Sequence, residues 1–171
     1  MPTNLNISIT RRVGLVSMAR PQVRNAFNET TIAELTDAFR TLGADPGLRA
    51  IVLAGDGPAF CAGADLDWMK RMVTWGEAEN RRDAEALGRM FLAIDSCPKP
   101  VVGRVHGMAL GGGTGLVAVC DVAVAEEETL FGTTEVRLGI VPAVIGPYVV
   151  RKIGESRARA CRSPQWGHSS S

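Results

Sequence analysis

A triple glycine at positions 111–113 lies between two apolar segments, within the sequence VHGMALGGGTGL at residues 105–116. Because glycine has no side chain, its backbone N–H can approach a ligand oxygen directly. A rigid N–H donor placed where negative charge develops is a large catalytic contribution, and removing one costs about 2.7–4 kcal/mol in a well-studied enzyme. The run predicts either an oxyanion hole or close packing of a helix on a sheet, since glycine serves both purposes.

A second turn of small residues has the sequence FCAGADL at residues 60–66. It follows an apolar segment and leads into LDWMK, where Asp65 can cap a helix. A second exposed backbone N–H is therefore available, although an ordinary strand-to-helix turn has the same composition. Asp65 and Asp67 together also suggest a metal, but helix capping accounts for both acids.

Other chemical signatures are missing. No GK[ST] follows a glycine loop, residues 111–115 do not form GxGxxG, and GxSxG does not occur. His106 and His168 each stand alone. The cysteines lie far apart, without a CxxC pair, and are expected to be reduced and mostly buried: Cys61, Cys97, Cys120 and Cys161. We expect no metal site.

Hydrophobic periodicity predicts the elements that must position these turns. An antiparallel pair of strands joined around residues 11–12 opens the chain, and later strands alternate with helices. Strands are expected at residues 5–9, 13–18, 50–54, 101–105 and 121–125, and helices at 31–42, 77–96 and from the glycine run onward. This order predicts an α/β fold with right-handed crossovers.

Size and charge narrow the class of protein. The chain has 171 residues, enough for one domain with a sizeable core, and 19 basic residues against 18 acidic ones. The sequence has no basic stripe with interleaved aromatics, so we do not expect nucleic acid as a partner. Neither a signal peptide nor an apolar run of membrane-spanning length is visible, so we expect a cytoplasmic protein without a membrane partner. Residues 161–171 show no periodicity and are expected to form a disordered or aberrant tail on a core at residues 1–160.

Four motifs together resemble the enoyl-CoA hydratase/isomerase (crotonase) superfamily. They are FCAGADL at residues 60–66, KPV with HGMALGGG within 99–113, CD at 120–121, and FGTTEVRLGIVP at 131–142. Their order and rough spacing are those of the family, over about residues 5–158. The resemblance implies a crotonase-like fold of repeated ββα units in a superhelix and a hydro-lyase acting on 2-enoyl-CoA thioesters. It implies no separate cofactor, because coenzyme A is part of the substrate.

The resemblance also assigns roles to residues. The backbone N–H groups of Ala64 and Gly112 would hold the thioester oxygen as it becomes enolate-like. Glu135, which taken alone would be a surface acid, would move a proton between water and the substrate α-carbon. Burial in an apolar pocket would raise the pKa of Glu135 toward the working pH. The residues expected to border the bound CoA thioester are Arg24, Ala62, Ala64, Asp65, Leu66, Trp68, Gly112 and Gly115.

Two of these assignments have simple structural alternatives. Arg24 could meet a CoA phosphate or be a solvated loop charge, because a lone arginine is a weak phosphate signal. Trp68, together with Met69, could line the acyl pocket or pack in the core.

Gly115 departs from the family pattern, in which typical hydratases carry a second glutamate two residues after the triple glycine. Its absence predicts room for a bulkier or carboxylated acyl group, with water handled by Glu135 alone or with the substrate's carboxylate. The segments DWMKRM at 67–72 and PAVIGPYVV at 142–150 resemble the branched glutaconyl-CoA hydratases of leucine and acyclic-terpene breakdown. A single acid/base is equally the arrangement of a double-bond isomerase.

Length is the second departure from the family. Members continue past this C-terminus with helices that complete the acyl pocket and build trimers, commonly doubled to hexamers. The C-terminal helical region is therefore expected to be missing here, and the longer form to be a homotrimer or hexamer. A third candidate function is a catalytically silent CoA-binding subunit.

Overall fold

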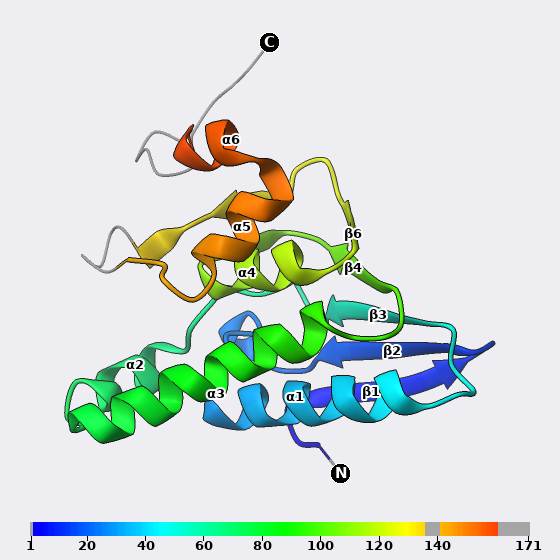
Figure 1. The fold of residues 1–171 in the computed structure, drawn as a ribbon, viewed down its shortest axis with the longest axis horizontal. Coiled ribbons are helices and arrows are strands. Elements are labelled where there is room, and N and C mark those ends of the chain that lie inside the picture. The colour runs from blue at the N-terminus through cyan, green and yellow to red at the C-terminus, as the bar shows by residue number, and fades with distance from the viewer. Residues whose placement is uncertain (1, 136–140, 161–171) are drawn as a thin grey trace.

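The computed structural model describes residues 2–135 and 141–160 (Figure 1). The predicted tail at 161–171, with Cys161 and His168, lies outside the described residues, as do positions 136–140 of the fourth motif. The elements are β1 (Leu5–Thr10), β2 (Val13–Met18), η1 (Pro21–Val23), α1 (Glu29–Ala44), β3 (Ala50–Gly55), α2 (Leu66–Met72), α3 (Glu77–Asp95), β4 (Val101–Val105), β5 (Met108–Leu110), α4 (Gly112–Val119), β6 (Val122–Ala125), β7 (Leu130–Gly132), α5 (Gly146–Ile153) and α6 (Glu155–Ala160).

The main sheet has the strand order β1-β2-β3-β4-β6. β1 and β2 are antiparallel, with Thr10 opposite Val13, and the remaining pairs are parallel. The turn between them holds Arg11 and Arg12 at positive φ, 49° and 69°. β5 and β7 form a separate parallel pair. The predicted α/β class and the opening antiparallel pair are thus confirmed.

Local capping and charge pairing explain where the long helices form. Asn28 caps α1 by accepting a hydrogen bond from the backbone N–H of Thr31 at 3.1 Å, so the helix begins before the predicted start at residue 31. On α3, two pairs of opposite charge lie one helical turn apart. They join Arg81 to Glu77 at 2.9 Å and Arg89 to Glu85 at 3.5 Å.

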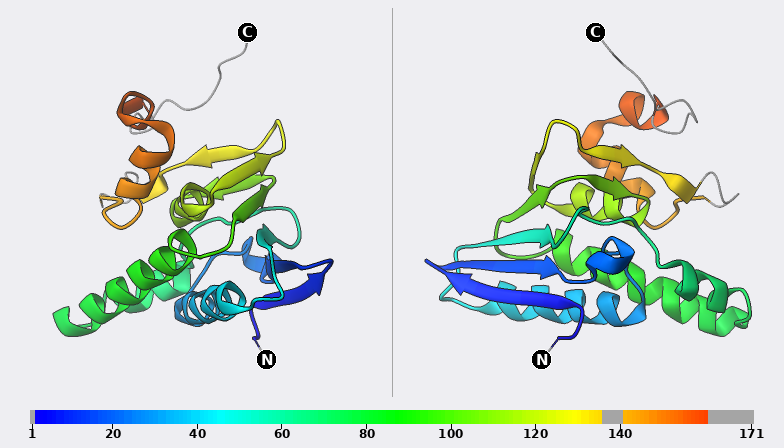
Figure 2. Two further views of the ribbon diagram at one scale, coloured as in Figure 1. Left: turned by 45° about the vertical axis from the view of Figure 1, so that its right-hand side comes forward. Right: turned by 180° about the vertical axis from the view of Figure 1, so that it is seen from behind.

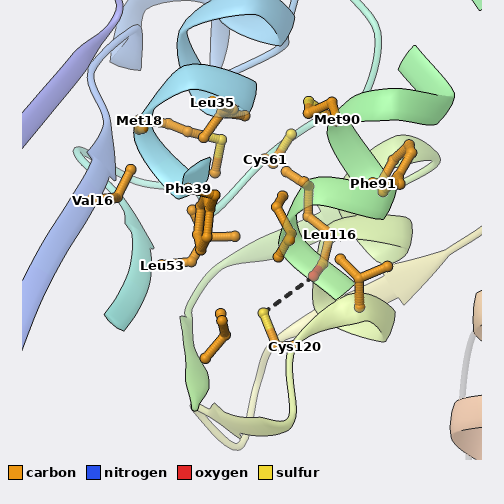
Figure 3. Close-up of a cluster of buried hydrophobic side chains, with 14 of the residues drawn as sticks. Val16, Met18, Leu35, Phe39, Leu53, Cys61, Met90, Phe91, Leu116 and Cys120 are labelled. Carbon is orange, nitrogen blue, oxygen red and sulfur yellow. Dashed lines mark hydrogen bonds between the residues drawn. The ribbon is translucent and has the colours of Figure 1, made fainter. Parts of the chain in front are cut away.

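Helices α1, α3 and α4 lie on one side of the main sheet, which is seen from behind in the right panel of Figure 2. The core fills the space between these layers, and Figure 3 shows part of it. Its largest buried side chains include Phe39 of α1, Leu53 of β3, Phe91 of α3 and Leu116 of α4. Each of these side chains lies in a segment that the hydrophobic pattern predicts as a strand or a helix.

The cysteines within the described residues are free, as expected. Burial raises the pKa of both Cys61 and Cys120 to about 12, so these thiols are protonated. The Cys120 Sγ donates to the Leu116 carbonyl at 3.2 Å. None of the described helices is both long and apolar enough to cross a membrane.

Candidate active site

The two glycine-bearing turns lie side by side. The Cys61 N–H donates to the Met108 carbonyl at 3.0 Å, and the Leu110 N–H donates to the Cys61 carbonyl at 3.0 Å. A Cβ atom added to Gly113 would lie 2.4 Å from the Cys61 carbonyl oxygen, closer than any side chain tolerates. Close packing therefore explains Gly113, one of the two roles that the triple glycine predicted.

The backbone N–H of Ala64 is left without an acceptor among residues 2–135 and 141–160. The amides on either side of it all have acceptors within the protein: Ala62 donates to the Arg24 carbonyl at 2.9 Å, Gly63 to the Cys61 Sγ at 3.4 Å, and Asp65 to the Phe27 carbonyl at 3.0 Å. The turn is thus held firmly while the N–H of Ala64 stays available for a ligand.

The backbone N–H of Gly112, the first residue of α4, likewise has no acceptor in the described part of the chain. A Cβ atom on Gly63 would lie 3.5 Å from the Gly112 nitrogen, so the two turns touch. A Cβ atom on Gly112 itself would lie 2.2 Å from the Phe27 ring, so only glycine fits beneath this ring. Two unpaired N–H groups therefore belong to adjoining turns, one of them at the positive end of a helix.

Glu135 is half-buried, with its carboxyl group beside the first glycine of the run. A Cβ atom on Gly111 would lie 3.3 Å from Glu135 Oε1. The other oxygen, Oε2, is buried and has no hydrogen-bond partner within the residues described. Burial raises the pKa of Glu135, opposed by a weaker hydrogen bond from its own backbone. The alternative of an ordinary surface acid is thus wrong for Glu135.

Asp65 caps α2, as predicted. Its Oδ1 accepts from the backbone N–H groups of Asp67 at 2.9 Å and Trp68 at 3.2 Å, and its Oδ2 pairs with Arg20 at 2.8 Å. No cluster of potential ligands within the described residues could hold a metal ion. Asp67 instead pairs with Lys70 at the surface.

Trp68 belongs to the core rather than to an open pocket. It is 2% exposed, and its ring is tilted against Phe27 at a centroid distance of 6.3 Å. Leu66, in contrast, is 69% exposed at the start of α2. Arg24 has an exposed side chain at a positive φ of 52°. Contacts of Arg24, Ala62 and Leu66 with CoA remain predictions.

The space predicted at Gly115 is filled. A Cβ atom there would lie 2.3 Å from Cγ2 of Ile145 and 3.0 Å from the Phe91 ring. The expectation that Gly115 opens room for a larger acyl group is therefore wrong, because Ile145 occupies that position from the start of α5. Sequence reasoning missed Ile145 since no local pattern pairs it with a glycine thirty residues away.

Sequence reasoning also missed Phe27 and Arg20. Both come from residues 20–27, and both contact the turn at residues 62–65. The neighbouring positive φ values of Arg24 and Asn25, 52° and 55°, mark how tightly this loop is folded. The residue type of Asn25 is a local signal that could have indicated this fold, because asparagine tolerates a positive φ.

Solved structures share the architecture. An enoyl-CoA hydratase from Shewanella pealeana superposes with a TM-score of 0.91 at 34% identity, over 94% of this chain and 61% of that chain. Pseudomonas aeruginosa AtuE gives a TM-score of 0.90 at 36% identity, over 93% of this chain and 62% of that chain. The predicted crotonase-like fold is thus confirmed.

Sequence comparison agrees. A Thermus thermophilus protein provisionally named an enoyl-CoA hydratase is 42% identical over 147 residues, which are 86% of this chain and 58% of that protein. The chain thus spans less than two thirds of the length of this relative. The family model described as enoyl-CoA hydratase/isomerase matches residues 8–163. The chain therefore belongs to the enoyl-CoA hydratase/isomerase family.

Proposed function

We propose that this chain carries the thioester-binding and proton-transfer groups of an enoyl-CoA hydratase, which adds water across the double bond of a 2-enoyl-CoA thioester. The observation that carries this proposal is the position of two backbone N–H groups relative to one carboxyl group. The N–H groups of Ala64 and Gly112, which have no acceptor among the described residues, lie on touching turns, and the partly buried carboxyl of Glu135 lies against the adjacent Gly111.

In the proposed reaction the two N–H groups bind the thioester oxygen. The Glu135 carboxylate removes a proton from water as the water oxygen bonds to the substrate β-carbon. The electrons of the double bond move toward the thioester oxygen, where both N–H donors stabilise the developing negative charge. The protonated Glu135 then returns the proton to the α-carbon, so that one water is added and the carboxylate is regenerated.

The environment of Glu135 supports this double role. A carboxyl with an ordinary pKa is a weak proton donor near neutral pH, whereas burial raises the pKa of Glu135 and brings its two protonation states closer in energy. The unpartnered Oε2 can accept a hydrogen bond from water or face the α-carbon.

The finer proposal is a branched glutaconyl thioester as substrate. It is supported by the sequence of α2 and of the segment before and within α5, which resemble hydratases of leucine and acyclic-terpene breakdown. It takes no support from free space at Gly115, which Ile145 fills. Contacts of CoA with Arg24, Ala62 and Leu66, and assembly as a homotrimer or hexamer, belong to the same proposal.

Double-bond isomerisation is a second candidate. It is favoured by Gly115, which leaves Glu135 without the partner carboxylate of typical hydratases. An isomerase shuttles one proton and takes up no water.

Incubation with a 2-enoyl-CoA distinguishes the candidates. Hydration removes the ultraviolet absorbance of the conjugated thioester and adds the mass of one water. A shift of the double bond without added mass indicates isomerisation. CoA-thioester binding with neither change indicates a silent subunit and contradicts the proposed reaction.

A further inference from the structure

We propose that Arg20 is a positioning residue that holds the N–H of Ala64 in place through Asp65, an inference that depends on the proposed thioester site. Arg20 itself need not touch the substrate. It joins the loop at residues 20–27 to the turn that carries the unpaired N–H.

The guanidinium of Arg20 makes two separate contacts. Its Nη2 pairs with Asp65 Oδ2 at 2.8 Å, and its Nη1 donates to the Ala26 carbonyl. The side chains of Arg20 and Asp65 are 16% and 11% exposed, so the pair is largely protected from water. It is the least exposed ion pair found among the described residues; the others involve at least one side chain that is about half exposed or more.

Asp65 transmits this anchoring to Ala64. Asp65, which follows Ala64, is held by three contacts. Its Oδ2 pairs with Arg20, its Oδ1 accepts hydrogen bonds at the N-terminus of α2, and its N–H donates to the Phe27 carbonyl. The residue before, Gly63, accepts from the Phe27 N–H at 2.9 Å. Ala64 is therefore held from both sides, while its own N–H has no acceptor within the described residues.

The Arg20 backbone is itself anchored, which makes its side chain a rigid connector. The Arg20 N–H donates to Asn25 Oδ1 at 2.9 Å, and the Asn25 N–H donates back to the Arg20 carbonyl at 2.9 Å. The Asn25 Nδ2 then donates to the Asp56 and Ala59 carbonyls at 2.8 and 2.7 Å. The loop is thereby tied to the end of β3, in the main sheet.

The charge state of Asp65 agrees with this role. Burial alone would raise the pKa of Asp65, but the hydrogen bonds from Arg20 and from the backbone of Trp68 and Asp67 hold it below its usual value. Lysine could not replace Arg20, because one ammonium nitrogen cannot reach both acceptors with the divergent geometry of a guanidinium.

The test measures polarisation of the bound carbonyl rather than turnover. A conjugated 2,4-dienoyl-CoA thioester absorbs at longer wavelength when its carbonyl oxygen accepts strong hydrogen bonds, so the red shift on binding reports the Ala64 and Gly112 donors. In Arg20→Gln and Arg20→Lys we expect the red shift to fall to about half or less. We expect the Kd of the thioester to change by less than about threefold, because most contacts with CoA remain.

Arg71→Gln is the matched control. It breaks another arginine–carboxylate pair, from Arg71 to Glu29 at 2.6 Å, but both side chains are about half exposed, at 49% and 48%. Neither side chain forms a hydrogen bond or ion pair with residues 62–65. The red shift and the Kd should match those of the unaltered chain. If Arg20→Gln does not fold, Asp65→Asn tests the same link, since it is isosteric and removes the charge that pairs with Arg20.

A full red shift in folded Arg20→Gln, or in Asp65→Asn where the former does not fold, overturns the inference and leaves the proposed function intact. Failure of the proposed thioester site itself gives a different result. If the unaltered chain does not bind the dienoyl thioester, or binds it without a red shift, the proposed thioester site fails and the inference fails with it.

Discussion

The carboxyl group of Glu135 lies directly against the backbone of Gly111, where a Cβ atom would be 3.3 Å from Oε1 and 3.1 Å from Oγ1 of Thr134. Gly111 has a φ of 52° and a ψ of −121°, a conformation that residues with side chains rarely adopt. One glycine thus combines a backbone turn that leads into α4 with the close approach of the proposed acid/base.

Gly111→Ala should both strain the turn and displace Glu135. We expect a loss of about 1–3 kcal/mol in the free energy of unfolding from the backbone strain. Turnover should fall by about tenfold or more, because misplaced catalytic groups lose orientation. Urea unfolding and steady-state kinetics measure the two effects. Gly146→Ala is the control, since nothing lies within 4 Å of its added Cβ and its φ is not positive. Equal behaviour of the two variants would contradict the close approach.

Glu135→Gln should reduce turnover by about 10²–10⁴-fold, the usual contribution of a positioned acid/base. Binding of the CoA thioester should persist, because the N–H groups of Ala64 and Gly112 are unchanged. Kinetics and calorimetric titration measure these separately. Glu127→Gln, which alters an exposed acid in the segment between β6 and β7, is the control and should keep full turnover. Unchanged turnover in Glu135→Gln would remove this residue from the mechanism.

Stability should depend on pH through Glu135 with a definite sign. Because burial raises its pKa in the folded state, the folded chain binds this proton more tightly than the unfolded chain does. Its contribution is most favourable below the ordinary glutamate pKa and is lost as the pH rises through the higher folded-state value. The difference in the free energy of unfolding between Glu135→Gln and the unaltered chain should therefore depend on pH. It should favour the variant more at neutral pH than at acidic pH. Urea midpoints from acidic to neutral pH test this, and a difference independent of pH would count against the burial of this carboxyl.

Gly115 and Ile145 should be energetically coupled. In Gly115→Glu the new Cβ atom would lie 2.3 Å from Ile145 Cγ2. We expect this overpacking to lower the free energy of unfolding by about 1–3 kcal/mol. Ile145→Ala alone should cost about 2–5 kcal/mol, since Ile145 is 3% exposed. In the double variant the losses should be less than additive, by about 0.5–3 kcal/mol. Gly88→Glu, whose added Cβ has nothing within 4 Å, serves as control, and strict additivity would show that Ile145 does not fill the site.

Local patterns predicted much of this molecule. The alternation of strands and helices and the cap at Asp65 both depend on residues within a few positions of one another. The family resemblance added the position of Glu135, whose burial the structure bears out. These features are accessible to sequence reasoning because periodicity, capping and short motifs are written in contiguous residues.

The sequence by itself therefore determined the fold class, the two glycine-bearing turns and the family. The tertiary structure alone decided which residues meet across the turns: Cys61 pairs with the backbone at Ala109, Arg20 with Asp65, and Ile145 with Gly115. Each of these partners is separated by thirty residues or more, so their contact is set by how α1, α3, α4 and α5 pack on the sheet. The mistaken expectation of open space at Gly115 has the same cause, because the volume left by a missing side chain depends on which distant residue fills it.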